Sequence, residues 1–298
     1  MSVSIFGLLM TILLAWVVGL LYMGISRKIT ARVQNRYGPP VHQQFIDVIK
    51  LFRKKTAISH GTMFHLGPVM AITGSISTLL FIPVLTGSRF WGALSFQGDL
   101  ILILYLMVFG SLGMALAVGE SANPNGIIGV SRGLTQMLGF ELPFLLAVIT
   151  LMVQYNTTSL VALTQAQAGG HWNLFHSPLA SAAAFLALLG MMGHQPFDVP
   201  IAPAEIASGP MSEFGGKYLG MMMSSRSIFV FAKLALFSDL FLGGSGNIVS
   251  LLLKTFAIFL WPVFVGLIYP RYRTEQSVRF FWGWPAAIGL LGLILVVW

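Results

Sequence analysis

The sequence predicts an all-α polytopic membrane protein, and three observations carry that prediction. Of the 298 residues, 56% are apolar and only 9% are charged, against roughly 25% charged residues in soluble domains. Apolar runs of about 20 residues, each long enough to cross a hydrocarbon layer of about 30 Å, recur along the whole chain. The basic residues gather between particular runs. Together these features predict a single integral-membrane domain over residues 1–298.

The absence of one residue type limits the chemistry further. The chain contains no cysteine, which removes disulfides, thiolate zinc sites and iron–sulfur ligation from this polypeptide. We therefore expect no catalytic centre, no cofactor and no metal site within the chain. Any redox centre of the assembly would have to belong to a partner.

Eight apolar segments are predicted as transmembrane helices, which would place both ends of the chain on one side. The first segment is longer than a signal-peptide core and has no basic leader, so we expect it to be retained as a helix. The spans are predicted near residues 3–25, 68–86, 99–118, 133–154, 178–193, 218–242, 248–269 and 281–298.

The basic residues predict the orientation of these helices. Thirteen lysines and arginines fall in the first, third, fifth and seventh loops or at the adjoining helix ends, against Arg89 alone on the other side. By the positive-inside rule, those four loops face the cytoplasm and both termini face outward. We therefore expect a multi-pass protein of the cytoplasmic (inner) membrane. The net charge of +8 then reflects topology and not nucleic-acid binding.

Three short motifs resemble enzyme or metal sites but fail on their context. Residues 129–133 fit the G-x-S-x-G pattern of serine hydrolases, yet they lead into a membrane helix with no strand before it. The Gly-Gly-Lys that ends at Lys217 lacks two residues that a phosphate loop requires. His60 and His65 are five residues apart, and not the four that aim two imidazoles at one zinc ion. We expect no site at any of them.

The first loop carries a predicted amphipathic helix near residues 41–53. Apolar residues from Val41 to Phe52 recur there at helical spacing, and polar residues occupy the opposite face. A basic stretch that ends in Gly-Pro-Pro precedes it. Such a helix lies flat at the membrane interface. Two interpretations stay open at this point, a lipid-headgroup anchor and a partner contact.

The fifth loop combines prolines with acidic residues. Four prolines and several small residues prevent one continuous helix, so Asp198, Glu205 and Glu213 are expected to project from an irregular segment. Three acids are unusual on a face that is otherwise basic. The loop is either an ordinary solvated connector or a proton-accepting or partner-binding surface.

A few ionisable groups lie within the predicted spans, where a charge costs about 2.5–3.5 kcal/mol on insertion scales. Glu141 in the fourth span is the candidate for a proton relay, because a buried carboxyl group can exchange a proton inside the membrane. Arg226 and Lys233 are seven residues apart, hence on one face of the sixth span, and could supply its counter-charge. A static ion pair that holds helices together is the alternative.

Four motifs in order make the sequence similar to a known family. They are ARVQNRYGPP before the amphipathic FIDVIKLF, then SRGLTQMLGFELP, then QPFDVPIAPAEIASGPMSEFGGKY, then PRYRTEQSVRFFW. The chain resembles the subunit-1 family of respiratory complex I and its hydrogenase relatives over nearly its whole length. Its compact Gly38-Pro39-Pro40 segment is most similar to the membrane anchor subunit of energy-converting (group 4) nickel–iron hydrogenases and formate hydrogenlyases.

The resemblance implies a membrane-anchoring and coupling subunit of an oxidoreductase complex that pumps protons or sodium ions. The implied partners are hydrogenase-like large and small peripheral subunits with iron–sulfur clusters and a NiFe site, antiporter-like membrane subunits, and membrane lipid. The residues predicted for the proton path and coupling are Glu120, Glu141, Asp198, Glu205, Glu213, Arg226 and Lys233. Of these, the resemblance implies Glu141 for the buried path and Asp198, Glu205 and Glu213 for the acidic loop. Those that it implies for docking of the peripheral arm are Arg32, Arg36, Gly38, Pro39, Asp47, Lys50, Phe197, Gly209, Pro210, Arg273 and Gln276.

The sequence also departs from the family pattern. Ile201 and Pro203 stand where the family's loop typically carries further acids, and His194 stands where complex I carries arginine. Fewer protonatable groups would mean a rerouted path, a changed coupling ion or a partner outside the well-studied enzymes. Two other functions are weighed against this one, namely the quinone-site subunit of NADH:quinone oxidoreductase and a stand-alone secondary transporter. Transporters often show two related halves, which this sequence lacks.

Overall fold

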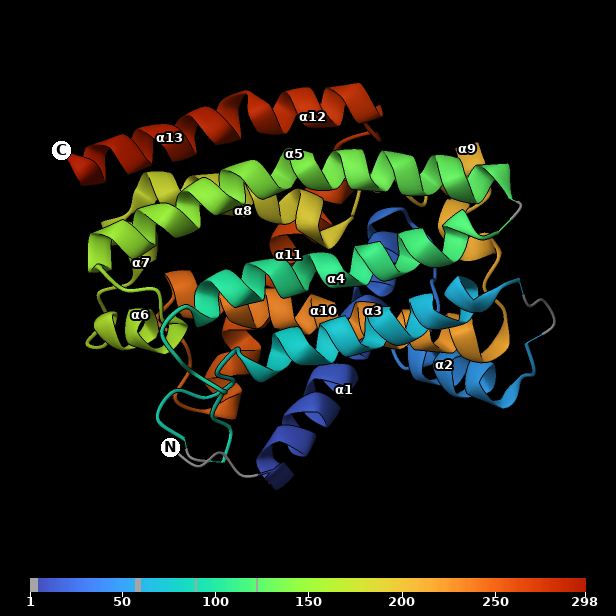
Figure 1. Ribbon diagram of the computed structural model, residues 1–298, viewed down its shortest axis with the longest axis horizontal. Helices are drawn as coiled ribbons and strands as arrows, with labels where there is room; N and C mark the ends of the chain where they lie inside the picture. Colours follow the sequence, from blue (N-terminus) through green and yellow to red (C-terminus); the bar gives the residue numbers. More distant parts are fainter. Residues whose placement is uncertain (1–4, 57–59, 89, 122) are drawn as a thin grey trace.

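A computed structural model describes residues 5–56, 60–88, 90–121 and 123–298, and all regular structure in those ranges is helical. The all-α prediction is confirmed. Figure 1 shows an elongated bundle whose long helices run roughly side by side. The helices are α1 (Ile5–Val33), α2 (Gln43–Arg53), α3 (Thr62–Leu80), α4 (Asp99–Gly119), α5 (Pro124–Tyr155), α6 (Leu160–Ala166), α7 (Asn173–His176), α8 (Pro178–Met192), α9 (Pro203–Ile206), the 3-10 turn η1 (Gly209–Ser212), α10 (Gly216–Phe241), α11 (Ile248–Ile268), α12 (Thr274–Trp282) and α13 (Trp284–Val297).

Within the described ranges, seven helices are long and apolar enough to cross a membrane: α1, α3, α4, α5, α10, α11 and the continuous α12–α13 segment. They correspond to seven of the eight predicted spans. The eighth prediction falls on α8, which has 15 residues, fewer than the roughly 20 that a perpendicular crossing needs. The number of crossings and the side on which each loop lies stay predictions. Arg89, which entered the charge count, lies outside the described residues.

Several helix boundaries differ from those predicted. The helix α1 continues to Val33 instead of ending near residue 25, so its last turns carry basic side chains beyond the apolar run. The helix α5 starts at Pro124 instead of 133, because the Asn123 side chain accepts a hydrogen bond from the Asn125 amide at 3.0 Å and caps it. The helix α3 starts at Thr62, with Pro68 inside the helix and not at its start.

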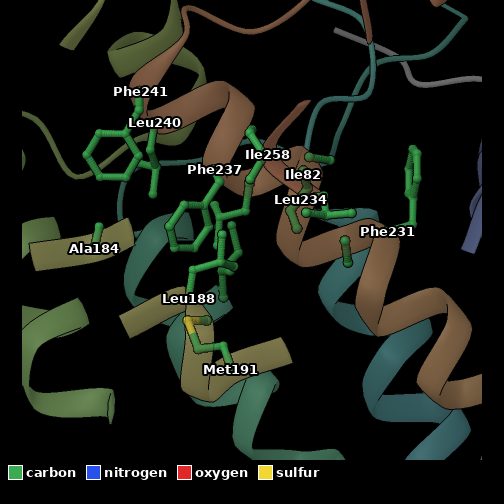
Figure 2. Packing of buried hydrophobic residues seen from close by; sticks show 14 of the residues in the cluster. Ile82, Ala184, Leu188, Met191, Phe231, Leu234, Phe237, Leu240, Phe241 and Ile258 are labelled. Carbon is green, nitrogen blue, oxygen red and sulfur yellow. The ribbon is translucent and has the colours of Figure 1, made fainter. Parts of the chain in front are cut away.

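The most enclosed of the long helices is α10, whose most apolar stretch is 72% buried inside the chain. In Figure 2, Phe237 of α10 lies near Leu188 of α8 and Ile258 of α11, all three in one cluster of buried residues. Inside a membrane such residues stabilise the bundle by close van der Waals packing and not by removal from water. Because protein surrounds α10, its ionisable side chains face the interior of the bundle.

The two ends of the bundle differ in what they carry. In Figure 1, α2 and α9 lie at the right end, whereas α6, α7 and the C-terminus lie at the left end. The helix α2 packs beside the first turns of α10: a Cβ atom built on Gly220 would lie 3.4 Å from the Phe52 ring. The fold therefore brings the amphipathic helix and the acid-bearing fifth loop to the same end.

Candidate functional site

The predicted amphipathic helix is present as α2, and a tight chain reversal sets it against α1. Gly38 reverses the chain with φ +68, and a Cβ atom there would lie 2.5 Å from the Cβ of Ala31. Before the turn, the Tyr37 ring lies under Lys28 at 4.5 Å and Arg32 at 5.0 Å. Glycine is thus required at the turn for both conformation and space.

The outer face of α2 exposes apolar side chains. Ile46, Ile49 and Phe52 are exposed, whereas Val48 is fully buried. Asp47 accepts a hydrogen bond from Gln43 at 2.9 Å and lies 4.0 Å from Arg27. An exposed apolar strip on a helix at one end of a membrane bundle fits either a lipid interface or a protein partner. The remaining residues predicted for docking on this end are exposed or partly exposed: Arg32, Arg36, Pro39, Lys50, Arg273 and Gln276.

Loop five, defined here as residues 193–215, is held in place by Arg271 from the segment before α12. The Arg271 guanidinium donates to both oxygens of Asp198, with Nε to Oδ1 at 2.7 Å and Nη2 to Oδ2 at 2.5 Å. The same side chain lies 3.5 Å from Glu205, which also accepts from Arg132 at 2.9 Å. The hydrogen bond to Asp198 raises the pKa of Arg271. A bidentate pair fixes geometry as well as charge, so Asp198 anchors loop five.

Three of the residues predicted to dock a partner are buried within loop five. The ring of Phe197 is 1% exposed and lies 4.6 Å from the Phe281 ring. Gly209, with φ +52, and Pro210 are buried against α5, where a Cβ atom on Gly209 would lie 2.6 Å from the Pro200 carbonyl oxygen. These residues shape the loop from within, and its outer surface is presented by others.

A second set of polar contacts joins the end of loop five to α3 and to the turn before α5. Glu213 accepts from Asn123 at 2.7 Å and lies 3.2 Å from the His60 ring nitrogen. Glu120 accepts from the Phe64 amide at 2.7 Å and so caps the start of α3. Glu120 and Glu213 therefore have identifiable structural partners, and both lie near the end of the bundle that carries α2.

The predicted relay residues border a cavity of about 990 Å³ between the helices, which also reaches exposed residues such as Tyr105 and Leu138. Glu141 lines this cavity, and within the described ranges no ion pair joins it to any base within 4.0 Å. Lys233, on the same cavity, donates to the Met191 carbonyl at 2.6 Å. The cavity is otherwise largely apolar, with Leu138, Leu142 and Phe144 among its lining residues.

A smaller cavity of about 410 Å³ lies next to the first, toward loop one. Arg36 and Gln34 line it from loop one and His194 lines it from loop five. Burial, together with the nearby positive charge of Arg226, lowers the pKa of His194 to about 4, so its imidazole is neutral at pH 7. Four residues border both cavities: Gly193, Asp198, Ile201 and Arg226.

The structure thus brings part of the predicted set together. Asp198, Arg226, Lys233 and Glu141 border one continuous region, from loop five to the membrane interior. Glu205, Glu213 and Glu120 lie outside its lining. Among the described residues no group of three or more histidines and acids could hold a metal ion.

Two residues at this site escape prediction from the sequence. Arg271, which the charge count treats as a topology marker, is the main partner of Asp198. Gln136 of α5 is 2% exposed and donates to the Phe197 carbonyl at 2.7 Å, while its own carbonyl oxygen has no partner in the described part of the chain. A glutamine inside an apolar segment is the one signal that could have revealed it.

Comparisons with known proteins agree with the motifs. Residues 6–297 match the NADH dehydrogenase family. One subunit of the F(420)H(2) dehydrogenase of Methanosarcina mazei is 27% identical, over 94% of this chain and 90% of its own. One subunit of the NADH-quinone oxidoreductase of Helicobacter pylori (strain J99) is 29% identical, over 91% and 89%. A chain in the structure of the membrane-bound sulfane sulfur reductase, an archaeal respiratory membrane complex, is 37% identical with a TM-score of 0.90, over 97% of this chain and 98% of that one.

Proposed function

Because the chain belongs to the NADH dehydrogenase family of membrane proteins, we propose that it anchors a peripheral redox arm to the membrane and couples electron transfer there to ion movement. The observation that carries this proposal is the pair of adjoining cavities that run from the basic first loop to Glu141. An electron-transfer partner docked at that end would lie beside the smaller cavity. The relatives named above are subunits of oxidoreductase complexes, and this chain is a multi-pass membrane subunit of that kind.

The docking surface in this proposal is the end of the bundle that carries α2 and loop five. Its exposed basic residues, Arg32, Arg36 and Lys50, supply charge for a peripheral subunit, and the apolar strip of α2 supplies contact area. Loop five is held rigidly to the bundle by Arg271. A rigid loop can transmit a shift of the docked subunit to the residues behind it, because packed elements move as units.

The test of coupling is Glu141→Gln in the complex purified through this chain and reconstituted in liposomes. The amide keeps the shape of the side chain but cannot carry a proton. We expect an assembled complex in which redox-driven ion transport falls at least tenfold, while redox turnover in the presence of an uncoupler stays within about twofold. Lys254→Gln, on α11 and outside both cavities, serves as the matched control. Unchanged transport by Glu141→Gln would reduce this residue to a structural role.

For the partner subunits, we propose an iron–sulfur peripheral arm of the hydrogenase type that does not use quinone. The compact Gly38-Pro39-Pro40 turn and the 37% identity to a chain of a sulfane sulfur reductase complex support an acceptor other than quinone. Metal analysis of the purified complex separates the possibilities. Iron with nickel and hydrogen evolution would support a NiFe site, iron without nickel and reduction of polysulfide would support a sulfur reductase, and inhibitor-sensitive quinone reduction would contradict the proposal.

The proposal also includes the membrane location and the orientation of the chain. We place the chain in the cytoplasmic membrane with the α2 end inward, since basic residues gather at that end. Cysteine introduced at Lys50 and at Phe175, at opposite ends, should react with a membrane-impermeant reagent from opposite sides of intact cells. The natural chain has no cysteine to interfere. Labelling of both from the same side would contradict the orientation.

A further inference from the structure

Arg226 is an enclosed cation for which the described protein provides no acceptor. Its side chain is partly buried within the bundle and lines both cavities. Within the described ranges, none of its nitrogen atoms makes a hydrogen bond or lies within 4.0 Å of a carboxylate oxygen. Asp198, the acid that lines both cavities together with Arg226, already accepts hydrogen bonds from Arg271 on both of its carboxylate oxygens. A guanidinium has five donors, so Arg226 presents several donors without a protein acceptor to the cavities that it borders.

The smaller cavity in front of Arg226 has the character of an anion site. Its lining contains the basic residues Arg36 and Arg226 and one acid, Asp198, which Arg271 already neutralises. His194 is neutral at pH 7, since its pKa is lowered to about 4, and can donate one ring N–H. The cavity opens beside the exposed Gln34 and Gln195. The excess of positive charge and of donors favours a ligand that is negative and accepts hydrogen bonds.

The size of the cavity limits the ligand. A volume of about 410 Å³ lies at the small end of the range for ligand pockets, and Val263 and Ile201 add an apolar wall. A planar monovalent carboxylate offers two oxygens in the geometry that a guanidinium fork matches. We propose that this cavity binds a small carboxylate anion, acetate or bicarbonate in kind, with Arg226 as its principal partner. This inference goes beyond the proposed coupling role, and its test does not depend on ion transport.

The experiment measures thermal unfolding of the intact purified complex while chloride, which lacks the paired oxygens that a guanidinium fork matches, is replaced by acetate at constant ionic strength. Binding to the folded state alone raises the melting temperature in proportion to ln(1 + c/Kd), where c is the acetate concentration, so the titration yields Kd, which is the half-saturating acetate concentration. We expect this rise in the natural complex and in Arg279→Gln, an exposed arginine of α12 that serves as the control. In Arg226→Gln the half-saturating acetate concentration should increase at least tenfold. A parallel titration with bicarbonate shows whether that carboxylate binds as well.

A second variant keeps the test informative if the complex with Arg226→Gln does not assemble. Arg226→Lys keeps the charge but loses the planar fork, so we expect acetate still to act, with a half-saturating concentration raised about threefold to tenfold. An acetate-dependent rise of equal size in Arg226→Gln would overturn the proposal. So would the absence of any rise in the natural complex, which is the result expected if water alone or an acidic side chain of a partner fills the cavity.

Discussion

Loop five and the interior of the bundle handle charge in opposite ways. In loop five every acid has a base or a donor at hydrogen-bond distance: Asp198 has Arg271, Glu205 has Arg132, and Glu213 has Asn123. In the interior, Glu141 and Arg226 border cavities, and no ion pair within 4.0 Å joins them to other described residues. Paired charges fix a conformation, whereas unpaired charges remain available to protons and ligands. The loop thus carries paired charges, whereas Glu141 and Arg226 have no ion-pair partner among the described residues.

The largest loss of stability is expected when the base that pairs with Asp198 in loop five, Arg271, is replaced. Replacement by glutamine in Arg271→Gln leaves Asp198 partly buried without its bidentate partner, and removal of one member of such a pair costs about 3–5 kcal/mol. We expect a comparable loss in the free energy of unfolding, measured by chemical denaturation of the complex. The double variant Arg271→Gln with Asp198→Asn should recover a large part of it. If the single variant is as stable as the natural chain, loop five is held by its apolar contacts instead.

The next effect is a pH dependence that originates at His194. Its pKa is about 4 in the folded chain and about 6.5 when unfolded. The unfolded state therefore binds this proton first, so the stability due to neutral His194 is complete above pH 6.5 and declines as the pH falls toward 4. The loss reaches at most about 3 kcal/mol at pH 4. Stability curves of the natural complex and of His194→Gln should separate over that interval and run parallel above it.

The control for this pH dependence is a histidine at the other end of the bundle. His171 is exposed, so His171→Gln should leave the pH dependence of the natural complex unchanged. Equal slopes for the natural complex and His194→Gln between pH 6.5 and 4 would mean that His194 gains its proton without opposing the fold.

The smallest effect expected is at Glu205. Its side chain is 50% exposed, although it lies 2.9 Å from Arg132 and 3.5 Å from Arg271. Exposed pairs contribute about 0–1 kcal/mol because water and salt screen them. Glu205→Gln should therefore lower the free energy of unfolding by less than about 1 kcal/mol, and by less still at high salt. A loss as large as that for Arg271→Gln would show that Glu205, and not Asp198, is the anchor of loop five.

The helices were predictable to different degrees, for identifiable reasons. Apolar run length alone located the seven long helices, since each such run has to satisfy its backbone internally in a membrane. Their ends were harder to predict: α1 continues through basic residues to Val33, and α5 starts at Pro124, directly after the Asn123 cap and nine residues before its predicted start at 133. Run length reports where lipid can lie, whereas capping and local contacts decide where a helix ends.

By itself, the sequence determined the all-helical membrane architecture, the amphipathic helix after the first span, the irregular acidic loop and the family. All of these depend on composition, on spacing along the chain or on contiguous motifs. Only the tertiary structure decided that Asp198 is held by Arg271, 73 residues away, that Phe197 faces inward, and that Arg226 lies between two cavities with no ion pair to another described residue. Such facts depend on which helices meet, and in a membrane every apolar helix surface is nearly equally compatible with lipid, so hydrophobicity does not choose the neighbours.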